Sequence, residues 1–453
     1  MKLSTRIPFV LALLATPIAA QSAAVLKKQL KKMESAAKKD PDALFEAGKW
    51  AKEANLEKDS KRIFQKVLKL AKDHAGANSE LGNQLVDGKW WPEKVAKKMR
   101  AAALKAEYEA KGYKKIDEIW VPPEEVDDAR KGIFVHEGEK VTRDEKELLQ
   151  AGKVRHPMTG QLIDKSNLEK AKTGYFPLRD GKWGDQKEAN KFHSELGRPW
   201  IIRTDHAQIL STLPIEKIDE LKRHVEQGIE KVSPLFGGRE VTPAKRPLII
   251  ISKTQSEFRD YATQLGDGTD VAGAFLIRDD AQFSIGGQGT VRPAICENHK
   301  DWGQRYIRHA AAIAYVNAIA EEGGADLPLW FIHGTGSFTS RFENDSDAGW
   351  FGKQHVAKGG VSNIKSFLSG FTLNGDMQSA DIAFNLFQSG LLLSYATQGG
   401  NREVTDAMVA VTDALSGKGK ASVGKCLSKL EKLLADNQDG IVAHLKKLIA
   451  KAP

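Results

Sequence analysis

The residues best suited to chemistry in this sequence are two histidines in its C-terminal half. His309 lies in a predicted helix at about 303–321, and His333 lies in the next predicted helix. Neutral imidazoles bind zinc, but two neighbouring imidazoles can instead share a hydrogen bond inside a protein core. A third ligand would have to come from acids whose spacing is typical of a solvated loop: Glu343, Asp345 and Asp347. Chemistry at the two histidines therefore depends on what the surrounding elements place beside them.

Apolar runs and helical periodicity predict the elements that would position these histidines. Two strand-like runs, Pro199–Arg203 and Pro247–Ser252, flank a helix at about 214–233 that has apolar residues at helical spacing. A hairpin is predicted from Phe275–Ile277 and Gln282–Ile285. The other predicted helices of this half lie at about 254–265, 361–371, 378–397, 402–416, 419–435 and 437–450. This order predicts a mixed sheet with helices, followed by an all-helical end.

Residues 197–450 resemble the gluzincin metallopeptidase domain of a family of secreted bacterial proteins. Many members of that family begin with tetratricopeptide-like helices and Gly-x-Trp units. One helix of the domain carries His-Glu-x-x-His, and a second helix opens with Trp-Phe/Leu-x-Glu-Gly-x-Ala. The two histidines and the glutamate of the second helix hold zinc, and the glutamate of the first helix is the general base. The resemblance rests on the two helix motifs, their spacing, the preceding strand order and the N-terminal modules together.

The resemblance implies a zinc site that has lost most of its chemistry. His309 stands at the first ligand position, Ala310 at that of the general base, and Ile313 at that of the second histidine. His333 stands where the glutamate ligand belongs, and Gly336 replaces the alanine of the motif. Loss of a general base typically costs about 10²–10⁴-fold in rate, and a two-histidine zinc site is weak. We therefore expect no catalytic residue and no cofactor, with weak zinc binding by the two histidines as the alternative.

The N-terminus has the pattern of a secretory signal peptide. Lys2 and Arg6 precede a short apolar run, Pro8–Ala15, and small residues follow. The run is too short for a transmembrane helix, so we expect cleavage after Ala20, with cleavage after Ala24 or an uncleaved anchor as alternatives. The pattern predicts an exported bacterial protein that is periplasmic, attached to the cell envelope or extracellular, with no transmembrane segment after cleavage.

Two kinds of module are predicted between the signal peptide and residue 195. Residues 42–75 have the pattern of a tetratricopeptide-type helical hairpin, in which Gly48 and Ser60 let two helices approach and Phe64 fills the gap. A weak repeat follows, in which a short extended piece leads through a turn into a helix with an acidic first turn. Its four members lie near Gly88, Ile119, Gly138 and Gly181. Their tryptophans are expected to pack one unit against the next.

Composition and charge narrow the classes of partner. Hydrophobic residues make up 41% of the chain and charged residues 28%, a balance that excludes a disordered or membrane-spanning protein. The formal charge is +9, or +7 once Lys2 and Arg6 are removed with the signal peptide. The lysines are spread among glutamates, which is typical of solvated helix faces, and no nucleic-acid motif is present. An anionic cell-envelope polymer is the alternative partner.

The two cysteines, Cys296 and Cys426, leave two alternatives open. They could form one disulfide in an oxidising compartment, or they could stay as buried thiols. Neither cysteine has the Cys-x-x-Cys partner that a cysteine zinc site requires.

These patterns predict an α+β protein whose parts are a signal peptide at 1–20, a tetratricopeptide-like helical region at 25–115, strand–turn–helix units at 116–195 and a degenerate gluzincin-like domain at 197–450 with a helical C-terminal subdomain. The expected function is that of a non-catalytic binding or scaffolding protein for a protein or peptide ligand. The former active-site cleft would be the groove, and the strand near 282–285 is a candidate edge for strand addition. A residual zinc hydrolase using His309 and His333 and a structural protein of the cell envelope are the alternatives.

Overall fold

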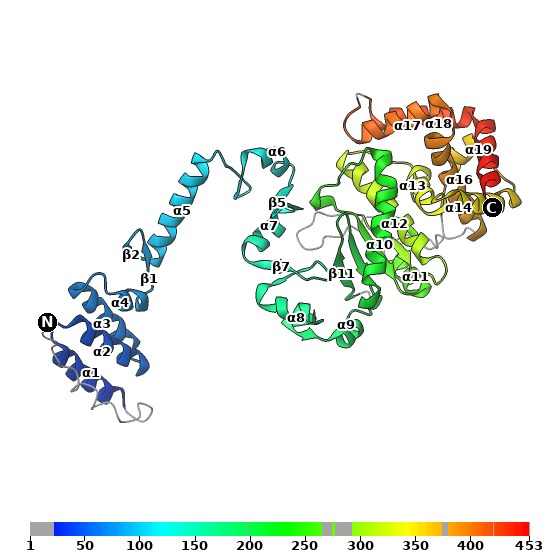
Figure 1. Ribbon diagram of the computed structural model, residues 1–453. Helices are drawn as coiled ribbons and strands as arrows, with labels where there is room; N and C mark the ends of the chain where they lie inside the picture. The colour runs from blue at the N-terminus through cyan, green and yellow to red at the C-terminus, as the bar shows by residue number, and fades with distance from the viewer. Residues whose placement is uncertain are drawn as a thin grey trace. The chain divides into compact units, whose positions relative to one another are not determined.

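A computed structural model describes residues 22–195, 197–264, 274–276, 292–373, 379–419 and 421–452. The chain divides into two compact units, residues 1–123 and 124–453, and each is described by itself (Figure 1). The predicted signal peptide at 1–20 and the predicted strand near 282–285 lie outside the described residues. Within the described ranges, no helix combines the length and the apolar character that a membrane span needs.

The first unit begins with four helices, of which two form a hairpin. These are α1 (Ala23–Ala37), α2 (Pro41–Glu53), α3 (Glu57–Leu70) and α4 (Ala75–Glu80). Helix α2 begins where Asp40 caps it and Pro41 enters its first turn. Gly48 lies against Phe64 of α3, so that a Cβ there would come within 2.4 Å of the ring. Ser60 Oγ donates a hydrogen bond of 2.9 Å to the carbonyl of Gly48, which confirms the predicted close approach of the two helices.

Within the described residues, short β-hairpins, each followed in the chain by a helix, occur five times. Three of them turn on two residues that both have positive φ, the backbone of a type I′ turn: Asp87 and Gly88, Asp117 and Glu118, Glu137 and Gly138. The preceding segment ends each time at a glycine with φ between 74° and 92°, which lets the chain leave the helix: Gly82, Gly112, Gly132, Gly152 and Gly174.

The first unit holds two of these hairpins and the second unit holds three. In the first unit they are β1 (Asn83–Val86) with β2 (Lys89–Pro92), and β3 (Lys114–Ile116) with β4 (Ile119–Val121). In the second unit they are β5 (Phe134–His136) with β6 (Glu139–Val141), β7 (Lys153–Arg155) with β8 (Leu162–Asp164), and β9 (Phe176–Pro177) with β10 (Trp183–Gly184). The helices that follow are α5 (Glu93–Ala110), α6 (Val126–Ala129), α7 (Arg143–Gln150), α8 (Leu168–Lys172) and α9 (Gln186–Phe192).

The sequence predicted four of these units and missed the one at β7 and β8. Its strands are joined by residues 156–161 instead of a two-residue turn, and no Gly-x-Trp marks it. In the other units the prediction found one strand, and the structure adds a second strand that pairs with it.

The second unit contains a five-stranded mixed sheet in the order β11-β12-β13-β15-β14. The strands are β11 (Trp200–Arg203), β12 (Gln208–Ser211), β13 (Leu248–Ser252), β14 (Ala274–Leu276) and β15 (Ala294–Glu297). Strands β12, β13 and β15 are mutually parallel, while β11 and β14 pair antiparallel at the two edges. Every residue of the central strand β13 is buried, as its continuous apolar run predicts. The predicted strand at 275–277 is therefore present as β14, but its partner among the described residues is β15.

Two helices join the sheet to the helical end of the unit. Helices α10 (Ile218–Val232) and α12 (Gly303–Glu322) pack against each other, and α12 also packs on β13, β14 and β15. Gly228 permits the contact between the two helices, because a Cβ there would come within 2.7 Å of the Arg308 carbonyl. Helix α13 (Leu329–Arg341) lies between α12 and α16, and Gly334 lies close to the carbonyl of Ser389 in α16.

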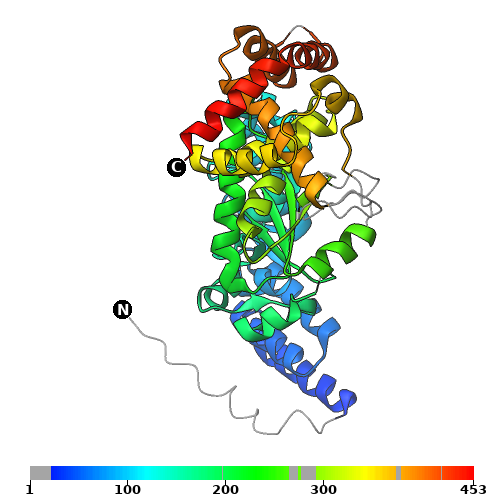
Figure 2. The same ribbon diagram turned by 90° about the vertical axis from the view of Figure 1, so that its right-hand side faces the viewer.

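Helix α11 (Gln255–Gln264) follows β13 and packs on the sheet. The helices after α13 gather at the C-terminal end of this unit (Figures 1 and 2): α14 (Asp345–Ala357), α15 (Ile364–Gly370), α16 (Ser379–Gln398), α17 (Arg402–Leu415), α18 (Val423–Asp436) and α19 (Gln438–Lys451). The sequence predicted all of these except α14. Sheet, α10, α12, α13 and the C-terminal helices share one hydrophobic core. That core fixes the facing sides of α12 and α13, where the two histidines lie.

Candidate functional site: a buried histidine pair and an adjacent pocket

The structure places His309 of α12 and His333 of α13 in direct contact. Nε2 of His309 lies 3.2 Å from Nδ1 of His333, and the ring centroids are 5.5 Å apart. The two residues are 2% and 3% exposed. The expected hydrogen bond between two core imidazoles is therefore present.

Arg341, at the C-terminal end of α13, determines how the proton sits on His309. One guanidinium nitrogen lies 3.5 Å from Nδ1 of His309. A guanidinium only donates hydrogen bonds, so Nδ1 accepts and the proton of the neutral ring is on Nε2. His309 then donates to Nδ1 of His333. Burial, with His333 and Arg341 beside the ring, holds the pKa of His309 well below its ordinary value, so the imidazole is neutral.

Gly336 makes room for this arrangement. A Cβ at position 336 would lie 2.6–2.8 Å from three atoms of the His309 ring. The alanine that the family motif carries there would therefore clash with the ring in its present position. The hydrogen-bonded position of His309 therefore requires a glycine at position 336.

The other two motif positions are filled by apolar side chains. Ala310 and Ile313 are both fully buried in the core of the second unit. Within the described part of the chain, no group of three His, Cys, Asp or Glu side chains is arranged to hold a metal ion. Both nitrogens of His309 are used in hydrogen bonds, and the nearest charge, Arg341, repels a cation. The residues present do not fit the three-ligand zinc site of a gluzincin.

The acids after α13 were expected in a solvated loop, which holds for Glu343, between α13 and α14, and is wrong for Asp345 and Asp347. Asp345 and Asp347 lie in the first turn of helix α14, which Asn344 caps. Asp347 pairs with Arg305 at 2.9 Å, and Glu343 pairs with Arg308. Two arginines of α12 thus hold these two carboxylates, and Asp345 lies 3.5 Å from Lys451. None of the three carboxylates completes a site with the histidine pair.

A pocket of about 410 Å³ lies beside the histidine pair, and Arg341 belongs to both. Its aromatic lining residues come from α12 and the residue that precedes it, from α14 and from α16: Trp302, Tyr306, Trp350, Phe351, Phe384 and Phe387. Its charged lining residues are Arg305, Arg341, Lys358 and Glu297. Pockets of this size and lining typically take small ligands.

The sequence analysis missed this pocket and its two most informative side chains, Arg341 and His355. Arg341 stands in the last turn of α13, where an arginine ordinarily complements the helix dipole. His355 stands in a helix that was not predicted. The cluster of aromatic residues at 350–351 was the signal available, but the segments that complete the pocket are distant in the sequence.

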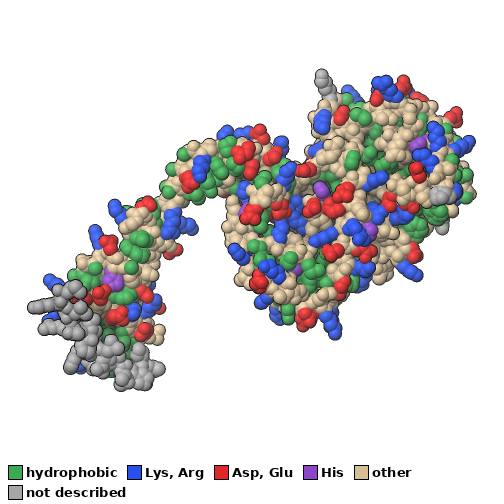
Figure 3. Space-filling view, viewed as in Figure 1, with side chains coloured by type: hydrophobic (Ala, Val, Ile, Leu, Met, Phe, Trp, Pro, Cys, Tyr) green, Lys and Arg blue, Asp and Glu red, His purple; other side chains and the backbone are tan. Residues whose placement is uncertain are grey.

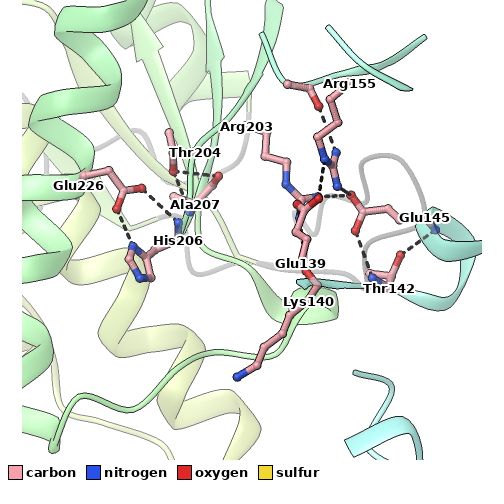
Figure 4. Close-up of polar contacts among 11 residues, drawn as sticks. Glu139, Lys140, Thr142, Glu145, Arg155, Arg203, Thr204, His206, Ala207 and Glu226 are labelled. Carbon is pink, nitrogen blue, oxygen red and sulfur yellow. Dashed lines mark hydrogen bonds and ion pairs between the residues drawn. The ribbon is translucent and has the colours of Figure 1, made fainter. Parts of the chain in front are cut away.

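A second polar cluster joins the hairpin units to the sheet (Figure 4). Arg203 of β11 points between Glu139 and Glu145, contacting Glu139 at 2.6 Å and also bonding Glu145. Arg155 of β7 reaches the same two carboxylates, at 2.9 Å and 3.4 Å. The side chains of Arg203 and Glu145 are each 9% exposed. Because these arginines and glutamates pair with one another, the cluster holds β6, α7 and β7 against the edge strand β11 of the sheet.

Cationic and anionic side chains are interspersed on the face that Figure 3 shows, as expected for solvated helix faces. Cys296 and Cys426 are both buried and free, and burial raises the pKa of the Cys296 thiol. Of the two alternatives left open for the cysteines, the structure has the buried thiols.

Comparison with models of known protein families, with curated proteins and with solved structures gives no match. The likeness to gluzincin metallopeptidases therefore rests on the residues described above. It enters below as part of a proposal.

Proposed function

We propose that this chain is an exported, non-catalytic binding protein built on a degenerate gluzincin-like domain. The observation that carries the proposal is the direct contact of His309 with His333, 3.2 Å apart in a closed core. In an active gluzincin the space between the equivalent side chains holds zinc and its water. Here the imidazoles bond to each other, and Arg341 occupies the second nitrogen of His309.

Catalysis by the family mechanism lacks two of its parts in this site. Ala310 has no proton acceptor, Ile313 has no metal ligand, and both are fully buried. Without the metal and the base, no group in the pair would generate a hydroxide at neutral pH. Two neutral imidazoles sharing one hydrogen bond are a structural element of the core.

Binding is supported by what the same domain retains. The pocket beside the pair is lined by aromatic and cationic side chains and is of ligand size. A domain that loses its metal chemistry and keeps such a pocket is suited to holding a ligand, and the helical hairpin and β-hairpin units offer surfaces for a protein partner. The proposed export rests on the sequence pattern of residues 1–20.

Zinc content of the purified, dialysed mature protein tests the non-catalytic assignment. We expect much less than one zinc per chain by elemental analysis, and no change in His309→Ala. Near-stoichiometric zinc that is lost in His309→Ala, or hydrolysis of an unfolded protein substrate that a chelator blocks, would contradict the proposal. N-terminal sequencing of the secreted or periplasmic protein tests export, with Gln21 or Val25 expected as the first residue.

A further inference from the structure

The guanidinium of Arg341 is a buried cation without a carboxylate. The residue is 9% exposed, and no ion pair among the described residues includes it. Its contacts are with Ser340 Oγ, with His309 Nδ1 and with the ring face of Phe351, whose centroid is 5.8 Å away. By contrast Arg305, on the same side of the pocket, is matched by Asp347 at 2.9 Å. A buried charge is unfavourable unless an opposite charge is paired with it, so an anion bound in the pocket beside Arg341 would be stabilised.

His355 is the second unmatched group in the pocket. It is 3% exposed, and neither ring nitrogen has a hydrogen-bond partner. Its ring stacks on Phe384, with centroids 4.1 Å apart, which leaves the nitrogens as edges available to a ligand. His355 lies one turn beyond Phe351 on α14, and Phe351 is the ring on which Arg341 rests. Phe351 and His355, at positions i and i+4, share one face of α14. Arg341 and His355 therefore both face the same pocket.

Aromatic rings form the rest of the wall. Trp302 and Trp350 have centroids 6.0 Å apart, and Trp350 is 48% exposed at the rim. A third cation, Lys358, lines the same pocket. The wall offers stacking surface for a flat or apolar body, while Arg341 and His355 offer donors for an anionic end.

We infer that this pocket binds an organic carboxylate carried on an aromatic or apolar body. The carboxylate accepts hydrogen bonds from Arg341 and His355, and the body stacks against the rings of Trp302, Trp350 and Phe384. The inference rests on the proposed binding function and names its ligand class. The same chemistry occurs in a free aromatic acid and in the C-terminal residue of a peptide.

A matched pair of probes tests the inference on the mature protein. N-acetylphenylalanine and its neutral amide differ only at the carboxylate, and both are titrated by calorimetry and by quenching of tryptophan fluorescence. We expect saturable binding of the acid, about tenfold or more tighter than binding of the amide, because charged hydrogen bonds are lost with the carboxylate. The peptide Gly-Gly-Gly-Phe separates the two sources of the carboxylate. If the peptide binds more than tenfold tighter than N-acetylphenylalanine, the ligand is a peptide C-terminus. If the two bind equally, the ligand is a small acid.

Three variants assign the effect to the named side chains. Arg341→Met is expected to remove the preference for the acid over the amide, and His355→Phe to weaken acid binding several-fold. Lys353→Met, on the exposed face of the same helix, should leave both affinities unchanged. If Arg341→Met does not fold, Arg341→Lys keeps the charge without the planar fork and should lose part of the preference.

Equal binding of acid and amide, no binding of either acid, or an unchanged preference in Arg341→Met would overturn the inference. Zinc content measured on the same samples keeps this result separate from the proposed function. A zinc-free protein that ignores the acids contradicts only the ligand assignment, whereas a zinc-loaded protein contradicts the non-catalytic assignment itself.

Discussion

At the scale of single residues, the ring of His309 is held at both of its nitrogens, and position 336 leaves room for it. His333 accepts from one nitrogen and Arg341 donates to the other. Gly336 leaves the space in which the ring lies. These contacts fix the orientation of the imidazole within the core.

Gly336→Ala should therefore destabilise the protein although alanine favours a helix. The added Cβ would lie 2.6 Å from the His309 ring, and displacing a packed ring costs about 1–3 kcal/mol. Urea unfolding gives the free energy of unfolding. Gly424→Ala in α18, where a Cβ would meet nothing within 4 Å, is the control and should stabilise by up to about 1 kcal/mol. Equal effects at the two glycines would show that His309 does not fill the space.

Arg341→Met should stabilise the protein while removing the anion preference. It replaces an uncompensated buried charge by an apolar side chain of similar length. We expect this gain to outweigh the loss of the long hydrogen bond to His309 and to raise the free energy of unfolding by on the order of 1–3 kcal/mol. Arg305→Met is the matched control, since Arg305 is paired with Asp347 and its loss should destabilise. Thermal melts of both variants measure these changes. A loss of stability in Arg341→Met as large as in Arg305→Met would contradict the statement that Arg341 is a buried charge without a partner.

The sequence could predict the histidine contact and could not predict the pocket. His309 and His333 fall at fixed positions of two helix motifs, so their helices could be matched to a known arrangement. Arg341 and His355 carry no such motif, because an arginine at a helix end and a histidine among aromatic residues are both ordinary in isolation. Only the packing of α12, α13, α14 and α16 brings Arg341 and His355 to the same pocket.

At the scale of elements, the hairpin units of the second unit depend on a buried charge cluster for their attachment to the sheet. Arg203 on the edge strand β11 bridges Glu139 of β6 and Glu145 of α7. Glu145 also completes a capping box with Thr142, so the same carboxylate starts the helix and anchors it. The charge pattern alone did not predict this cluster, because its members lie in three separate segments.

Arg203→Met should detach this region from the sheet. Removing one partner leaves Glu145 buried without its closest cation, which typically costs about 3–5 kcal/mol. In Arg203→Met, amide hydrogen exchange of residues 134–150 should be faster than in the parent, whereas exchange in the rest of the second unit should change less. Arg143→Met breaks an exposed pair with Glu147 on the same helix and should change stability by less than about 1 kcal/mol. Similar behaviour of the two variants would argue against a structural role for the cluster.

The element pattern itself was largely predictable, because strands and helices in this chain are marked locally. Glycines at the ends of helices and paired turn residues at positive φ define the hairpins with two-residue turns. The unit at β7 and β8 escaped because no Gly-x-Trp marks it, and α14 escaped because Gly349 and Gly352 weaken its helical pattern and its apolar residues are few. Local signals of this kind weaken where tertiary packing, rather than capping or turns, holds the element.

At the scale of the whole molecule, buried histidines make stability depend on pH. Burial lowers the pKa of six histidines: His156, His193, His224, His309, His355 and His444. Below about pH 6.5 the unfolded chain takes up protons that the folded chain does not, so stability falls as the pH falls. His206 has the opposite sign, since its hydrogen bond to Glu226 raises its pKa and its contribution is lost as the pH rises.

His355 should contribute the best-defined share of this acid sensitivity. Burial, with Lys358 nearby, lowers its pKa to about 4, so its contribution disappears between about pH 6.5 and pH 4. The full loss amounts to about 3 kcal/mol. Between pH 7 and pH 4 the melting temperature of the parent should fall more steeply than that of His355→Phe, which lacks the titrating group. Parallel pH profiles for the two proteins would show that His355 is protonated in the folded state.

The two free cysteines, buried in β15 and α18, mean that the native chain carries no covalent cross-link. Under the proposed export, the unfolded chain would enter a compartment where thiols are oxidised, and each cysteine would have to be buried before it formed a non-native disulfide. Since the folded protein has no disulfide to reduce, its melting temperature should not change with added reductant. Its stability rests on non-covalent packing, above all in the core shared by the sheet and the C-terminal helices of the second unit.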